Sequence, residues 1–115
     1  MNRFERTLIE SIRLLASDPD TQLAAYPRCG VDEIALVFDD WFTVVSGRSD
    51  TTLSAGGMEQ VRALDTALKR MSGSENAELW TPGALRCSPE WHRIRTLARS
   101  ALAAVGSEYR KPVVE

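Results

Sequence analysis

Apolar side chains recur with the period of an α-helix along most of this chain. The clearest run lies between Ser88 and Gly106, where Trp91 and six later apolar residues fill an arc of about 140° at roughly 100° per residue. Ser88 is suited to accept a hydrogen bond from the first turn, and Pro89 fits the first helical position. Gly106 can end the helix in a left-handed conformation. The pattern therefore predicts an amphipathic helix over residues 89–105.

The N-terminal quarter of the chain shows the same period together with signals for where helices begin. Residues 2–16 open with Asn2, and Glu5 three positions later fits the reciprocal capping pattern. Residues 18–25 open with Asp-Pro and precede a Tyr-Pro pair, and a residue before proline avoids the helical region. We therefore expect a helix over 2–16 and a short helix that ends at residue 25.

Residues 54–72 form the next amphipathic pattern, with Ser54 as the expected N-cap. We expect its first turn to fray, because the two glycines at positions 56–57 are weak helix formers. After a polar loop, the apolar pair at 79–80 is expected to be extended. The Thr-Pro pair at 81–82 is expected to start one helical turn before the last helix.

Residues 31–45 allow two interpretations. As a helix, they place seven apolar side chains within an arc of about 120°: Val31, Ile34, Ala35, Phe38, Trp41, Phe42 and Val45. As a β-hairpin over 33–46, two five-residue strands would meet at an Asp-Asp turn, which the β-branched and aromatic content favours. Asp-Asp is a poor substitute for Asn-Gly in such a turn, so we favour the helix. Three apolar residues fall outside its apolar face: Leu36, Val37 and Val44.

Together these elements predict an all-α fold, a small bundle of four amphipathic helices plus a short helix. The alternative is an α+β fold with the β-hairpin at 33–46. With 115 residues the chain is expected to form a single helix-rich domain over 1–115. A chain of this size buries roughly two thirds of its unfolded surface, so it needs no disulfide or metal to fold. The three tryptophans are expected in the core, with a small-ligand pocket as the alternative: Trp41, Trp80 and Trp91.

The formal net charge of −2 is close to neutral, but the charges are unevenly placed along the chain. Residues 31–40 carry four acids and no base: Asp32, Glu33, Asp39 and Asp40. Residues 85–115 carry six bases against three acids, and the bases are Arg86, Arg93, Arg95, Arg99, Arg110 and Lys111. The two regions are expected to face each other, within one chain or across a homodimer. The alternative is that one of them meets a charged partner.

Candidate reactive groups are few. Cys87 and His92 are the only thiol and imidazole near one another in sequence, and a thiolate beside a base is the nucleophile of cysteine hydrolases. Because His92 falls on the outer face of its helix, we expect a structural thiol and a surface histidine. One histidine and two distant cysteines supply no metal-ligand spacing, and the acids of 31–40 lack the order of a calcium loop. We therefore expect no metal and no cofactor.

The segment TTLSAGGMEQVRALDTALKRM resembles the Leu-Ser/Thr-x-x-Gly-x-x-Gln run of histidine phosphatases over about twenty residues. The resemblance would imply a phosphoryl-transfer site built from two histidines. No Arg-His-Gly sequence precedes the segment, and His92 is the only histidine, so such a site cannot be assembled. We interpret the segment as a capped amphipathic helix.

These observations favour a small cytosolic, non-enzymatic protein-interaction domain, such as an adaptor or an immunity-type inhibitor, whose partner is unknown. Its acidic segment could cover a basic site on that partner. One alternative is an enzyme that uses Cys87 and His92. The other is a nucleic-acid binder that uses Arg93, Arg95 and Arg99, although nucleic-acid domains are usually strongly basic. We expect no membrane span and a cytoplasmic location with reduced thiols, because MNRFERTLIE has no apolar signal region.

Overall fold

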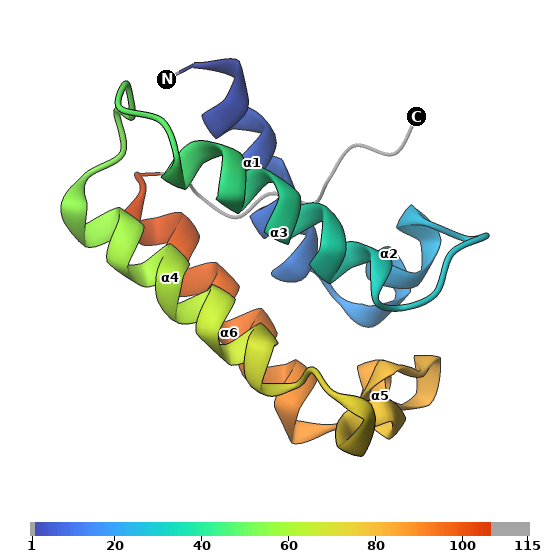
Figure 1. The fold of residues 1–115 in the computed structure, drawn as a ribbon. Coiled ribbons are helices and arrows are strands. Elements are labelled where there is room, and N and C mark those ends of the chain that lie inside the picture. The colour runs from blue at the N-terminus through green and yellow to red at the C-terminus, as the bar shows by residue number, and fades with distance from the viewer. Residues whose placement is uncertain (1, 107–115) are drawn as a thin grey trace.

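The computed structural model describes residues 2–106, and all regular elements in this range are helices (Figure 1). The four long helices are α1 (Arg3–Leu15), α3 (Glu33–Ser46), α4 (Ala55–Arg70) and α6 (Pro89–Ala104). The three short ones are α2 (Pro19–Ala25), the 3₁₀-helix η1 (Ser74–Trp80) and α5 (Pro82–Cys87). The predicted all-α bundle is confirmed, and the α+β alternative is wrong because residues 33–46 form a helix.

The α3 helix forms because its buried side chains recur at helical spacing. Ile34, Phe38 and Val45 lie on one face and are at most 4% exposed. A strand would send successive side chains to opposite faces, so it could not bury this set on one side. The helix ends at Gly47, whose backbone N–H donates to the carbonyl of Thr43.

The predicted helix starts are confirmed by hydrogen bonds. The side chain of Asn2 accepts from the backbone N–H of Glu5 at 2.9 Å, and the Glu5 carboxylate reaches back to the Asn2 backbone to complete the capping box. The Ser88 hydroxyl accepts from the backbone N–H of Trp91 at 3.2 Å. The Ser54 hydroxyl accepts from the backbone N–H that lies three residues later, at 2.9 Å. These caps satisfy amides that have no partner inside a helix.

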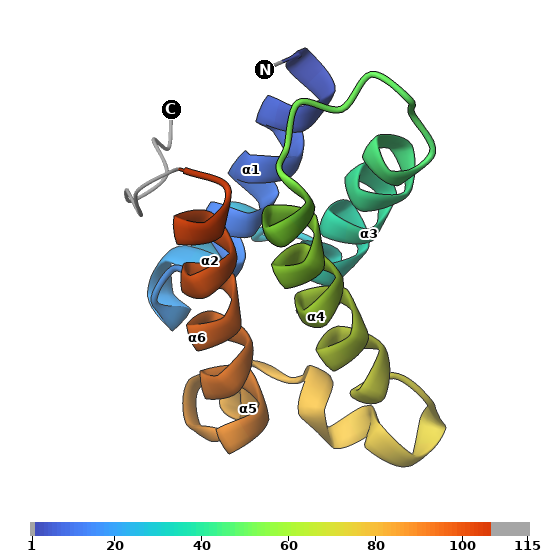
Figure 2. The same cartoon turned by 90° about the vertical axis from the view of Figure 1, so that its left-hand side faces the viewer.

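The long helices close three sides of a four-sided bundle and leave the fourth side open. Helix α1 packs against both α3 and α6, and α6 packs against α4. The open side lies between α3 and α4, which do not pack closely against each other, whereas α4 packs against α6. Figure 2 shows α4 between α6 and α3. The core inside this frame is apolar, and its largest fully buried side chain is Trp91. The open side decides where a ligand can enter.

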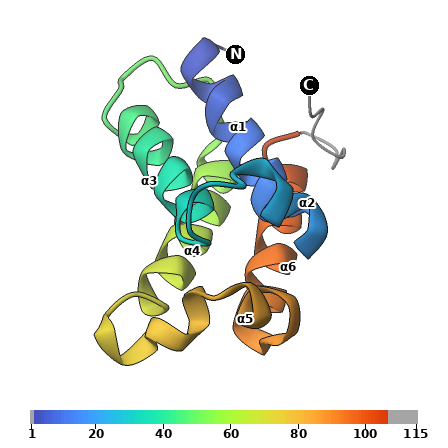
Figure 3. The ribbon, with the colours of Figure 1, turned by 90° about the vertical axis from the view of Figure 1, so that its right-hand side faces the viewer.

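The short helices η1 and α5 lie together at one end of the bundle, between the end of α4 and the start of α6 (Figure 3). The expectation that Leu79 and Trp80 are extended is wrong, because both residues belong to η1. The indole N–H of the buried Trp91 donates to the carbonyl of Leu79 at 2.6 Å. This hydrogen bond favours the helical conformation of η1, because a buried indole N–H needs an acceptor. Helix α5 starts as expected, with the Thr81 hydroxyl as its cap.

The first turn of α4, for which fraying is expected, is helical from Ala55 onward in the structure. Gly57 is buried inside the helix, and a Cβ atom built on it would lie 2.9 Å from Val105 Cγ1 and 3.2 Å from the carbonyl oxygen of Ala104. The missing side chain therefore lets the start of α4 approach the end of α6 closely. Gly56 has no such neighbour within 4 Å.

None of the helices within residues 2–106 has the length and apolar character that a membrane span requires.

Candidate functional site

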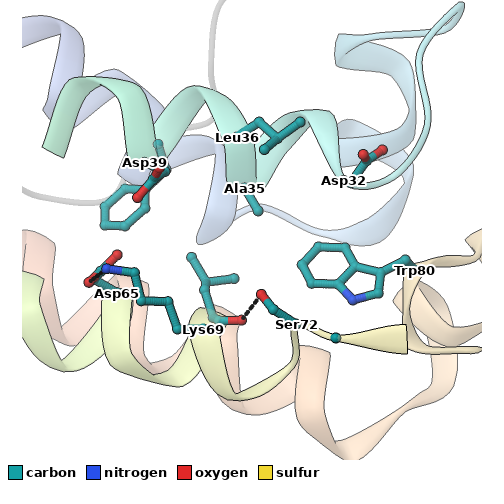
Figure 4. A pocket seen from close by; sticks show the side chains of 11 residues that line it. Asp32, Ala35, Leu36, Asp39, Asp65, Lys69, Ser72 and Trp80 are labelled. Carbon is teal, nitrogen blue, oxygen red and sulfur yellow. Dashed lines mark hydrogen bonds and ion pairs between the residues drawn. The ribbon is translucent and has the colours of Figure 1, made fainter. Parts of the chain in front are cut away.

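The open side of the bundle holds a groove of about 460 Å³, which we call the α3–α4 groove (Figure 4). A volume of this size is typical of sites that take a small molecule or a few side chains of a partner. Its floor and end wall are apolar, and its rim is charged. The residues that line it include Asp32, Ala35, Leu36, Phe38, Asp39, Asp65, Leu68, Lys69 and Trp80.

The floor of the groove comes from the same apolar faces that build the core. Phe38 of α3 is fully buried, and Leu68 of α4 is 5% exposed. Ala35 is half-buried on the α3 side, where its small side chain leaves room. Leu36, on the rim, is 51% exposed and is one of two large apolar side chains that remain exposed within residues 2–106. The apolar surface that a ligand could remove from water is therefore mainly that of Leu36, with the half-buried Ala35 and Trp80, and not that of the floor.

Trp80 forms the end wall of the groove and is held on several sides. Its indole N–H donates to the carbonyl of Met71 at 2.8 Å, just after the end of α4. Its ring meets that of Trp91 edge to face, with ring centroids 5.3 Å apart. Because its N–H is hydrogen-bonded to Met71 and its ring packs against Trp91, Trp80 offers a fixed aromatic surface to the groove. Figure 4 shows Asp32 at the same end.

The opposite end of the groove carries a cluster of charges. Asp65 is 8% exposed and accepts a hydrogen bond from Lys69 at 2.8 Å. That hydrogen bond raises the pKa of Lys69 above its ordinary value, and the charges of Asp65 and of Asp39 across the groove raise it further. Three carboxylates thus face one ammonium along the groove, counting Asp32 at the far end. The groove as a whole favours a cation.

The acidic segment predicted as a partner surface is divided by the helix. Asp32 and Asp39 line the groove, whereas Glu33 and Asp40 do not. Each member of the second pair follows one residue after a member of the first, so it is turned by about 100° around α3. Consistent with this, the negative charge of Glu33 adds to burial in raising the pKa of Tyr26, which lines a different cavity.

The basic residues predicted to face this acidic segment pair elsewhere in the described range. Arg86 binds Asp20 at 2.6 Å, and Arg95 donates to Gln22 and to the carbonyl of Leu85. Burial lowers the pKa of Arg95 from its ordinary value, which the nearby Asp18 partly offsets. Arg86 and Arg95 therefore do not pair with the acidic residues of 31–40 within the chain.

The last helix also lacks the continuous basic stripe that the nucleic-acid alternative needs. Arg95 is turned toward α2 and α5, as its hydrogen bonds show. Arg93 is exposed but lines a separate cavity of about 330 Å³ together with Glu78 and Glu90. Arg99 is exposed on α6. Arg110 and Lys111, the other two bases of the region, lie outside the described residues.

The candidate reactive pair is not assembled in the structure. Cys87 and His92 are both exposed, and within the described part of the chain no hydrogen bond joins the thiol to the imidazole. Cys29 and Cys87 are both free and exposed in the structure. Over residues 2–106, no three histidine, cysteine or acidic side chains gather closely enough to hold a metal ion.

Sequence reasoning identified only part of the groove. The sequence pointed to Asp32 and Asp39 as charges of a partner surface, but not to Asp65 and Lys69 as part of the same site. The signal that could have found the site was Leu36, an apolar residue that falls off the buried face of α3 and stays exposed beside the groove.

Comparisons of the chain with protein-family models, curated proteins and solved structures gave no match.

Proposed function

We propose that this chain is a non-enzymatic protein-interaction domain that binds a basic, partly apolar segment of another protein in the α3–α4 groove. The observation that carries the proposal is the combination of accessible apolar surface at Leu36 and Trp80, above the buried floor, with an excess of carboxylates around it. Burial of apolar side chains would supply most of the affinity. The carboxylates would attract basic partners and reject acidic ones. An adaptor and an inhibitor that covers a basic surface both fit this description.

The arrangement of the other candidate groups supports a binding role rather than catalysis. The thiol of Cys87 and the imidazole of His92 are exposed to water and are not linked to each other. A cysteine nucleophile needs a base within hydrogen-bond reach to activate it. In the groove itself the charged groups are carboxylates and an ammonium paired with one of them, which suits ion pairing with a basic side chain, and the Ser72 hydroxyl donates to the carbonyl of Leu68.

A displayed library of random 16-residue peptides tests the proposal without knowledge of the natural partner. Selection on the wild-type protein should enrich peptides that combine lysine or arginine with apolar residues. The recovered peptides should bind the Ala35→Phe variant at least tenfold more weakly, because the added ring occupies the groove. Recovery of peptides without basic enrichment, or equal binding to both proteins, would contradict the proposal.

A further inference from the structure

Asp32 and Asp39 place two negative charges two helical turns apart on one side of α3. They are separated by seven residues, which corresponds to about 10.5 Å along a helix axis at 1.5 Å per residue. Both line the groove. The Asp32 side chain makes no capping hydrogen bond at the start of α3, so its carboxylate is not engaged by the helix that carries it.

The surface between the two carboxylates is apolar. Ala35 lies between them on α3 (Figure 4). Phe38 and Leu68, both buried, also line the groove. A ligand that fits this surface needs a cation at each end and apolar side chains in the middle. This order of charge, apolar surface and charge defines the partner more narrowly than net charge does.

We infer that the basic segment bound in the groove is an amphipathic α-helix with lysine or arginine at positions i and i+7 and apolar residues at i+3 and i+4. The inference rests on the proposed function. In a helix, residues seven apart return to the same face within about 20° and are separated by the same distance as the two aspartates. The residues at i+3 and i+4 lie between them on that face and point at the floor.

An extended segment fits the two charges less well. Side chains on one face of a strand are spaced by about 6.6 Å or 13 Å. One of the two cations would therefore fall short of its carboxylate by roughly 4 Å or pass it by roughly 3 Å. A helix also suits the site for a second reason. The groove lies between two helices on the side where the bundle is open, and a third helix packs into such a gap by the same ridges and grooves that join the others.

Peptides selected from the random library provide the test. Their basic residues should be spaced by seven more often than by two or four. A synthetic copy of the strongest binder should lose at least tenfold in affinity when a central residue outside the basic and apolar contact positions is replaced by proline, which breaks a helix. Moving one basic residue by two positions at constant composition should also lose at least fivefold, as measured by fluorescence anisotropy.

The outcomes separate this inference from the proposal beneath it. If the proline and the shifted peptides bind within twofold of the parent, yet all bind the Ala35→Phe variant weakly, the helical register is wrong and the groove remains the binding site. If the selection yields no basic peptides, the proposed function fails and the register fails with it. Weakening by proline and by the shift, together with loss of binding to Ala35→Phe, supports both.

Discussion

Helix α4 meets its two neighbours in opposite ways. Against α6 it approaches so closely at Gly57 that a single added carbon would lie 2.9 Å from Val105. Toward α3 it leaves a groove of about 460 Å³, rimmed by Asp39, Asp65 and Lys69. Small side chains allow two helices to close together, whereas charged side chains keep their surfaces apart and solvated. One helix therefore serves both as a structural element and as one wall of a binding site.

The separation of α3 from α4 is maintained by the loop that joins them. The carboxylate of Glu5, on α1, accepts hydrogen bonds from the backbone N–H and the hydroxyl of Thr52, at 3.1 and 2.9 Å. The guanidinium of Arg48 lies 4.3 Å from the ring centre of Phe4. Both contacts fix residues 47–54 to the N-terminal end of α1, so the loop holds the two helices at a set spacing.

Filling the closed side of α4 should have the largest effect on stability. Gly57→Val places a branched side chain against Val105 and the Ala104 carbonyl, and overpacking of this kind typically lowers the free energy of unfolding by about 1–3 kcal/mol. Gly56→Ala is the matched control, because its Cβ meets nothing within 4 Å. That control should raise stability by up to about 1 kcal/mol through helix propensity. Urea unfolding midpoints of the two variants would measure this, and equal midpoints would show that the close approach is not there.

Removing the loop attachment should have the next largest effect. Glu5→Ala deletes the capping box and both hydrogen bonds to Thr52 at a side chain that is 1% exposed. The loss should be about 1–2 kcal/mol, with faster amide exchange in residues 47–54. Glu59→Ala, at an exposed position on α4, should change stability by less than about 0.5 kcal/mol. Unaltered exchange in the loop of the Glu5 variant would argue against the attachment.

Filling the open side should leave stability nearly unchanged. Ala35→Phe extends into the groove, where space exists, so the free energy of unfolding should stay within about 0.5 kcal/mol of wild type. The difference between the free energies of unfolding of Ala35→Phe and Gly57→Val measures how much more room the α3 side of α4 has than the α6 side. A loss as large as that of Gly57→Val would mean that the groove is closed in solution.

The smallest expected effect concerns pH and the exposed end of the same loop. The hydrogen bond from Arg48 lowers the pKa of Asp50 below its ordinary value of 3.8. An aspartate with a lowered pKa adds stability that is fully present above the ordinary pKa and is lost as the pH falls through the lowered one. Asp50→Asn should therefore flatten slightly the dependence of the unfolding midpoint on pH below about 4. An unchanged slope would mean that this pair contributes nothing, as is common for exposed ion pairs.

Much of this fold was predictable because helix starts and buried faces are local properties. Asn2, Ser54 and Ser88 were identified as caps from the residue type alone. A helix over residues 31–45 was predicted from its period, and the structure places it at Glu33–Ser46. The groove was not predictable in the same way, because the distance between α3 and α4 depends on contacts such as that of Glu5 with Thr52, 47 residues apart. Trp80 was likewise misjudged as extended, since its conformation depends on bonds to residues outside its own segment.

The role of the groove itself is tested most directly by two double variants of α3 that remove the same amount of charge. Asp32→Asn with Asp39→Asn neutralises the groove, and the Asp32 side chain makes no capping hydrogen bond that the change could remove. Glu33→Gln with Asp40→Asn neutralises the other side of the same helix. The dissociation constant of a library-selected basic peptide should rise at least tenfold for the first pair and less than twofold for the second. Equal losses in both would show that the peptide senses the overall charge of α3 and that the groove is not its binding site.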